Sequence, residues 1–241
     1  MRKLLYFIII MGVCQTAGFA SYEEALQLYT QKKYEDSLTQ IASELVIEKD
    51  FDQKSPNYEL RYLAAHNHWK LGNYESAAAH LKRCTEIQKD ITDPLIDLAA
   101  LLIEQKKFRE AETYTVRALS IQKEPMAYYL TGKAAYGVGN FWRAKEFYEK
   151  AISLDPELYV AYNGLGCSLM KLERYSQANT AFSAALAIAP DSAEVLNNMG
   201  LSLEKLGRAN DALAYYKKAS EYAPDNPVIV ANLNRLGEKQ K

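Results

Sequence analysis

Glycine, proline, cysteine and histidine are scarce in this sequence, and the two signs of charge nearly cancel. The 241 residues include 11 Gly, 7 Pro, 3 Cys and 3 His. So little Gly and Pro excludes a collagen-like or low-complexity disordered chain. Lys and Arg number 29 against 30 Asp and Glu, so no excess of positive charge favours nucleic acid or an anionic membrane as a partner. With 49% apolar residues, a chain of this length can bury a sizeable core.

The few histidines and cysteines leave little material for catalysis or metal binding. His66 and His68 are two residues apart, so on a helix they point to different faces and cannot hold one metal ion together. His80 and Cys84 are four apart and share a face, but two ligands do not complete a zinc site. The sequence has no glycine-rich phosphate loop. We therefore predict no enzyme activity, no catalytic residue, no metal site and no other cofactor.

The one long apolar run lies at the N-terminus, in the segment MRKLLYFIIIMGVCQTAGFA. Arg2 and Lys3 precede the apolar residues 4–13, and small residues then lead to Ala20. This order is typical of a secretory signal peptide, with cleavage after Ala20. The run is shorter than the about 20 residues that span a bilayer. Residues 1–20 are therefore predicted to be a signal peptide, and the mature protein to be periplasmic or secreted.

Two other fates of this segment remain open. A lipid anchor on Cys14 is one, although Val13 is branched where lipoprotein signals usually have a small residue. An uncleaved membrane anchor is the other. Export permits disulfides, but Cys84 and Cys167 belong to non-neighbouring units of the repeat that follows in the chain. We expect no bond between them, because a disulfide needs Cα atoms within about 7 Å.

An internal repeat of 34 residues organises the rest of the chain. The stretch YNGLGCSLMKLERYSQANTAFSAALAIAP, residues 162–190, is followed 34 residues later by LNNMGLSLEKLGRANDALAYYKKASEYAP. Small residues recur where two helices must approach closely, and large residues recur beside them. The aligned sets are Gly132, Gly166 and Gly200; Ala144, Ala178 and Ala212; Tyr148, Phe182 and Tyr216; Ala151, Ala185 and Ala219; and Pro156, Pro190 and Pro224.

Each repeat is predicted to contain two amphipathic helices joined by a short turn. In one unit the two apolar stripes are Tyr162, Leu165 and Leu169, then Ala178, Phe182 and Ala185. Gly139 and Gly207 stand where such helices need a C-cap. Asp191 and Glu194 are expected to form a capping pair for the next helix. Proline closes the later units, because it cannot continue a helix interior.

The pattern predicts an all-α array with six repeats between residues 21 and 226. The expected repeats are 21–57, 58–91, 92–124, 125–158, 159–192 and 193–226. An extra segment near residues 48–56 predicts either a longer second helix or a bulged loop in the first repeat. Residues 227–241 are predicted to form a capping helix and tail, in which the apolar stripe of Ile229, Leu233 and Leu236 would cover the last repeat.

These spacings resemble the tetratricopeptide repeat family. The matching residues in one unit are Leu165, Gly166, Tyr175, Ala178, Phe182, Ala185 and Pro190. Glu173 replaces the usual turn glycine and Thr131 a usual leucine. The resemblance implies a right-handed superhelical solenoid of about six helix pairs, whose first helices line a concave groove. It also implies a protein that binds other proteins and performs no chemistry.

The groove positions of the family map onto aromatic, basic and amide side chains here. The predicted partner-binding residues are Tyr62, His66, Trp69, Tyr129, Lys133, Tyr136, Asn163, Met170 and Asn197. Aromatic side chains supply large contact areas with a polar tip, and the two Asn side chains can hydrogen-bond an extended peptide. Each residue could instead pack between repeats. Some family members grip a C-terminal carboxylate with Lys and Asn, but the matching run of basic residues is absent here.

The sequence therefore predicts a non-enzymatic scaffold or adaptor that acts outside the cytoplasm. Its groove would bind a partner protein or extended peptide, as part of an envelope or secretion assembly. The alternative is a periplasmic holdase-type chaperone for exported proteins, which would take many weak clients. Neither nucleic acid nor a small-molecule substrate is expected, and membrane contact would come only through a partner.

Overall fold

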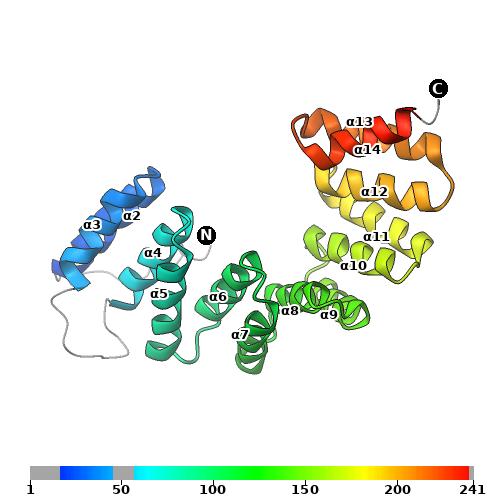
Figure 1. Cartoon of the computed structure of the whole chain (residues 1–241). Helices are drawn as coiled ribbons and strands as arrows, with labels where there is room; N and C mark the ends of the chain where they lie inside the picture. Colours follow the sequence, from blue (N-terminus) through cyan, green and yellow to red (C-terminus); the bar gives the residue numbers. More distant parts are fainter. Residues whose placement is uncertain (1–16, 46–56, 239–241) are drawn as a thin grey trace. The chain divides into compact units, whose positions relative to one another are not determined.

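The computed structural model describes residues 17–45 and 57–238. Within these ranges every regular element is an α-helix (Figure 1). None of these helices combines the length and the apolar character that crossing a membrane requires. The helices are α2 (Ala17–Thr30), α3 (Tyr34–Leu45), α4 (Asn57–Lys70), α5 (Tyr74–Ile87), α6 (Asp93–Glu104), α7 (Phe108–Ile121), α8 (Pro125–Gly137), α9 (Phe141–Leu154), α10 (Tyr159–Lys171), α11 (Tyr175–Ile188), α12 (Ala193–Lys205), α13 (Ala209–Tyr222) and α14 (Pro227–Glu238).

The helices follow the predicted repeats two by two, from α2 with α3 to α12 with α13, and α14 follows as a single helix. The all-α helical repeat solenoid is thereby confirmed. Residues 1–16 of the predicted signal peptide, 1–20, lie outside the described residues, and residues 17–20 belong to α2. The extra segment near residues 48–56 also lies outside the described residues, and α3 ends at Leu45.

The chain forms two compact units, residues 1–94 and 95–241, which divide within the first turn of α6. In unit 1, α2 packs on α3, α3 on α4 and α4 on α5, and the first helices α2 and α4 also touch. Ala25, Ile41, Leu60 and Leu63 are buried together in its core. Apolar residues at helical spacing on these short helices therefore meet one another across the helix pairs.

In unit 2, each helix from α7 to α14 packs on the next one in the chain. The first helices of successive repeats also contact each other, α8 with α10 and α10 with α12. Figure 1 shows the end of this stack, where α12, α13 and α14 lie side by side. The first helices α8, α10 and α12 thus form a layer of their own.

The repeated glycines lie where a first helix meets a large ring of its partner helix. A Cβ added to Gly132 would lie 2.9 Å from Cδ1 of Tyr148, and one added to Gly200 would lie 2.6 Å from Cε1 of Tyr216. Gly166 faces the ring of Phe182 in the same way. The predicted pairing of small and large residues is therefore confirmed, because any side chain at these positions would overlap the ring.

The turn after each first helix places one residue in the left-handed region. Gly139 has φ 84°; its N–H donates to Tyr136 O (3.0 Å), and the N–H of Asn140 donates to Ala135 O (2.9 Å). This pair of bonds is a Schellman C-cap, as predicted. Glu173 takes the same conformation with φ 58°.

The predicted capping pair before α12 does not form. Ser192 is the N-cap of this helix, without a side-chain capping bond, and the carboxylate of Glu194 accepts a hydrogen bond from Asn163 instead. The predicted start of α14 is confirmed. Oδ1 of Asn226 accepts hydrogen bonds from the N–H groups of Val228 (3.0 Å) and Ile229 (3.3 Å).

Candidate protein-binding face

The first helices of unit 2 present a mixed aromatic, apolar and basic surface. We call it the unit 2 face. It comprises Tyr129, Lys133 and Tyr136 on α8, Asn163, Cys167, Met170 and Lys171 on α10, and Asn197, Leu201 and Lys205 on α12. On each helix these residues recur at intervals of about one turn, which places them on one side. The structure thus groups on this face six of the nine predicted binding residues.

Tyr129 and Tyr136 of α8 both contact the second helix α9, and Tyr129 also contacts Lys133. The Tyr129 ring lies 5.9 Å from that of Tyr148, and Nζ of Lys133 lies 5.9 Å from the centroid of the Tyr129 ring. The Tyr136 ring meets Phe141 edge-on at 5.2 Å. Burial raises the pKa of Tyr129 to about 12, and the pKa of Tyr136 rises for the same reason. Both hydroxyls stay protonated and can donate hydrogen bonds.

Asn163 and Asn197 are largely buried, at 9% and 6% exposure, and bridge successive first helices. Nδ2 of Asn163 donates to Glu194 Oε1 (2.9 Å), and its Oδ1 accepts from Asn198 Nδ2 (2.9 Å). One repeat later, Oδ1 of Asn197 accepts from Asn232 Nδ2 (2.9 Å). These two amides connect neighbouring repeats, which is the packing alternative that the sequence left open for each predicted binding residue.

Glu194, Asn198 and Asn232 were not singled out from the sequence as binding residues. The signal that could have found them is spacing. Asn198 and Asn232 are 34 residues apart, and each donates to an asparagine 35 residues earlier in the chain. A repeated pair of polar residues at the repeat period indicates a bond between repeats.

Cys167 lies near the middle of the unit 2 face and is not activated as a nucleophile. Burial, with a smaller effect of Glu194, raises its thiol pKa to about 12. Its Sγ lies 3.5 Å from Nδ2 of Asn198. Cys84 is fully buried, and burial likewise raises its pKa to about 12. Both are free thiols that remain protonated, so they act as packing residues.

In unit 1 the first helix α4 carries a row of rings along one side. Tyr58 stacks on Tyr62 (5.9 Å), Tyr62 meets His66 edge-on (4.7 Å), and His66 stacks on Trp69 (6.3 Å). The structure thus brings together the three predicted binding residues of α4. Tyr58 is buried and extends the row by one turn. It was not predicted as part of this row, although its spacing of four residues from Tyr62 places both on one side of the helix.

His68 points away from this row, toward the second helix α5. Its ring stacks on that of His80 at 5.5 Å. Burial lowers the pKa of both histidines, that of His80 to about 4. The described residues contain no cluster of three or more His, Cys, Asp or Glu that could hold a metal ion. The pair therefore lies in the packing between α4 and α5 as neutral rings.

The models of protein families identify the repeat. Models described as tetratricopeptide repeat match residues 58–91, 127–158 and 163–227. The chain belongs to the tetratricopeptide repeat family. These matches cover the helix pairs α4–α5, α8–α9, α10–α11 and α12–α13, whose first helices carry all of the predicted binding residues. In tetratricopeptide repeats this helix-pair scaffold supports protein–protein interaction.

Solved structures share this fold at low sequence identity. PilW, a widely conserved type IV pilus biogenesis factor, is 15% identical with a TM-score of 0.76, covering 91% of this chain and 100% of its own. MamA from Desulfovibrio magneticus RS-1 is 18% identical with a TM-score of 0.62, covering 72% of this chain and 98% of its own. YrrB, a TPR protein with an unusual peptide-binding site, is 17% identical with a TM-score of 0.58, covering 78% and 95%. No curated protein sequence matches the chain.

Proposed function

We propose that this protein is a non-enzymatic scaffold or adaptor that binds an extended segment of a partner protein on the faces of its first helices. The observation that carries the proposal is the cluster of Tyr129, Lys133 and Tyr136 on α8. Two partly buried rings and a cation lie together on this first helix, and the rings contact Tyr148 and Phe141 of α9. Pre-positioned aromatic side chains lose little conformational freedom on binding, which makes them effective anchors.

The proposal includes a location outside the cytoplasm. It rests on the N-terminal sequence, with Arg2 and Lys3 before a short apolar run. Sequencing the N-terminus of the native protein should return Ser21 as the first residue. A retained Met1 would contradict export by cleavage, and a lipid on Cys14 would point to an anchored protein instead.

We further propose that the partner belongs to an envelope or secretion assembly. Among the proteins that share the fold, PilW is a factor in type IV pilus biogenesis, and YrrB has a peptide-binding site. Both share the fold at identities that support no transfer of a specific partner. The assembly is therefore identified by experiment, through affinity capture from envelope extract followed by mass spectrometry.

The binding face is tested with the captured partner. The double variant Tyr129→Ala and Tyr136→Ala should weaken binding by about 30-fold or more, since a single aromatic anchor often contributes about 2 kcal/mol. Tyr114→Ala with Tyr222→Ala, on the second helices α7 and α13, is the matched control and should bind like the wild type. Circular dichroism checks that both variants fold. Unchanged affinity of the first variant would exclude the unit 2 face as the binding surface.

A holdase-type chaperone for exported proteins is the alternative function. The aromatic row on α4, Tyr62, His66 and Trp69, favours it, because such a row can contact apolar segments without a fixed sequence. Stoichiometry separates the two functions. One partner retained at a fixed ratio supports the adaptor, whereas many clients with weak affinities support the holdase.

A further inference from the structure

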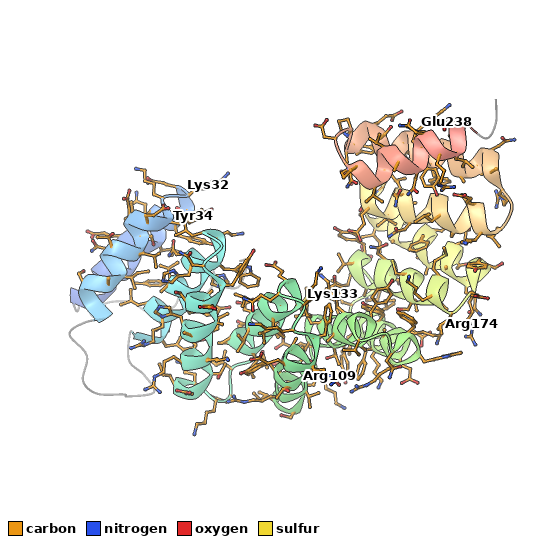
Figure 2. The ribbon with its side chains drawn as sticks, in the orientation of Figure 1. Lys32, Tyr34, Arg109, Lys133, Arg174 and Glu238 are labelled. Carbon is orange, nitrogen blue, oxygen red and sulfur yellow. The ribbon has the colours of Figure 1, made fainter. Side chains whose placement is uncertain are left out.

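Three lysines bring positive charge to the unit 2 face. Lys133, Lys171 and Lys205 are exposed, one on each of the successive first helices α8, α10 and α12. None of them forms an ion pair with another described residue. Figure 2 labels Lys133 and shows it well apart from Arg174, which lies at the turn that leads into α11.

Two acidic side chains of α12, Glu194 and Glu204, form hydrogen bonds with other residues. Glu194 accepts the hydrogen bond from Asn163. Glu204 accepts two bonds from Arg235, at 2.5 and 2.6 Å, and a third from the hydroxyl of Tyr216 at 3.1 Å. By contrast, exposed acids stand among the lysines of the second helices, and Lys145 pairs with Glu149 on α9 at 2.6 Å. What sets the lysines of the first helices apart is their place beside the rings of the unit 2 face, with Lys133 over the ring of Tyr129.

Apolar and aromatic groups lie between the lysines. Tyr129 and Tyr136 on α8 are partly exposed, and Met170 on α10, also partly exposed, packs against the core of the later repeats. Lys133 lies over the ring of Tyr129, so its ammonium group and the ring belong to one site. The amides of Asn163 and Asn197 are engaged between repeats. The groups of this face that we expect to bind a partner are therefore the lysine ammonium groups and the tyrosine rings. Asn163 and Asn197 are not expected to bind a peptide backbone or a terminal carboxylate.

We infer that the unit 2 face binds an internal acidic segment of a partner protein in an extended conformation. Side-chain carboxylates of the segment pair with Lys133, Lys171 and Lys205, and apolar side chains between them pack on Tyr129 and Tyr136. Charge complementarity commits the face to this occupant. Nucleic acid is not favoured, because the whole chain has 30 acidic against 29 basic residues. This inference rests on the proposed function and specifies the chemistry of its partner.

Synthetic peptides test the inference without knowledge of the natural partner. The probe is a fluorescein-labelled, C-terminally amidated peptide of about ten residues, which is long enough to cross three helices spaced about 8–10 Å apart. It carries several Glu and two Phe in a Gly and Ser background. Matched peptides replace every Glu with Gln or with Lys. Fluorescence anisotropy should show at least about tenfold tighter binding of the Glu peptide than of the Gln peptide, with a loss of affinity as salt rises.

The decisive comparison uses two triple variants with the same change in net charge. Lys133→Gln, Lys171→Gln and Lys205→Gln should reduce binding of the Glu peptide to the level of the Gln peptide. Lys150→Gln, Lys217→Gln and Lys218→Gln remove exposed lysines of α9 and α13 and should leave binding unchanged. Equal losses in both variants would mean that only net charge matters, and would overturn the inference.

Two further probes distinguish other anionic ligands. A Gln peptide with a free C-terminus that binds as well as the Glu peptide would assign the face to terminal carboxylates and overturn the internal segment. Tighter binding of a single-stranded DNA oligonucleotide of matched charge would overturn the choice of a protein. If the peptides fail while Tyr129→Ala with Tyr136→Ala still loses the captured partner, the acidic segment is wrong and the proposed function stands.

Discussion

Six turns in the described chain hold one residue at positive φ, and three of these residues carry side chains. Gly72, Gly139 and Gly207 have φ of 76°, 84° and 76°, whereas Lys32, Lys106 and Glu173 have 62°, 59° and 58°. An L-residue in this region is strained by about 1–2 kcal/mol, and glycine is not. Replacing such a residue with glycine removes this strain. Part of the gain in stability is lost, because glycine has more conformational freedom in the unfolded chain.

Glu173→Gly should therefore raise the free energy of unfolding by up to about 1 kcal/mol, measured by urea denaturation. Gly139→Ala is the reciprocal control and should lower it by about 1 kcal/mol or more. A Cβ on Gly139 would meet no atom within 4 Å, so this effect isolates the backbone. A neutral Gly139→Ala would show that the left-handed turn is not what restricts this position.

Gly200 tests the close approach of helices. Its substitution by alanine places a methyl group against the Tyr216 ring, with only 2.6 Å between the Cβ and Cε1. Gly200→Ala should destabilise unit 2 by about 1–3 kcal/mol, as overpacking typically does. Gly237→Ala on α14 is the control, because nothing lies within 4 Å of its Cβ; helix propensity predicts a small gain there. A similar result for both alanines would contradict the predicted role of the Tyr216 ring.

Helix α14 covers the final repeat, as an array requires. Ile229 is 2% exposed and packs with Leu196 and Ala219, and Leu236 is 4% exposed in the core cluster with Met199 and Leu203. Replacing both Ile229 and Leu236 with alanine should lower the free energy of unfolding by several kcal/mol, since each such truncation costs about 2–5 kcal/mol. Val228→Ala with Asn234→Ala, both exposed on α14, is the matched control and should change it little.

The order of the helices could be predicted from the sequence because each one repeats the same packing rule. Gly166 and Phe182, or Gly200 and Tyr216, recur at a fixed period, and the structure places each pair in contact. The turns could be predicted for the same reason. Even at Glu173, which stands where other repeats have glycine, the backbone keeps the left-handed conformation. The boundary between the two units inside α6 was not predictable, since no change in the repeat pattern marks it.

The candidate site was predictable in part. The rings of Tyr62, His66 and Trp69 form a row because their spacing places them on one side of α4. The roles of Asn163 and Asn197 were not predictable, because a bond across repeats depends on two residues that are 35 positions apart. Helical periodicity shows which side a residue is on, but it does not show whether a neighbouring helix covers that residue.

Unit 1 contains a partly buried histidine pair, His68 and His80, and we expect this pair to make the stability of unit 1 sensitive to acid. At the repeat position of His68, other repeats have Leu102, Leu169 and Leu203, and at the position of His80, two of them have Tyr114 and Tyr215. Burial, with His68 and Arg61 nearby, lowers the pKa of His80 to about 4, and burial also lowers that of His68. An unfolded histidine has a pKa near 6.5. Between about pH 6.5 and 4 the unfolded chain therefore binds more protons, and acid weakens unit 1.

Glu59, also in unit 1, changes the stability with pH in the opposite direction. Burial raises its pKa above the usual value, so its contribution to stability is present at low pH and is lost as the pH rises. The stability profile of unit 1 thus sums two opposed effects, and only a comparison between variants isolates the histidines. Unit 2 has no histidine, since all three lie between residues 66 and 80.

Hydrogen exchange at pH 7 and pH 5, read by mass spectrometry, should therefore separate the units. After correction for the intrinsic pH dependence of exchange, amides of α4 and α5 should lose protection at pH 5 relative to those of α10 to α13. The double variant His68→Leu and His80→Tyr, which copies the residues of other repeats, should reduce this loss, because neither new side chain gains a proton in this range. His66→Gln, on the other side of α4, is the control and should retain the wild-type loss. An equal loss in α4–α5 of the double variant would mean that the buried histidine pair does not control the acid response of unit 1.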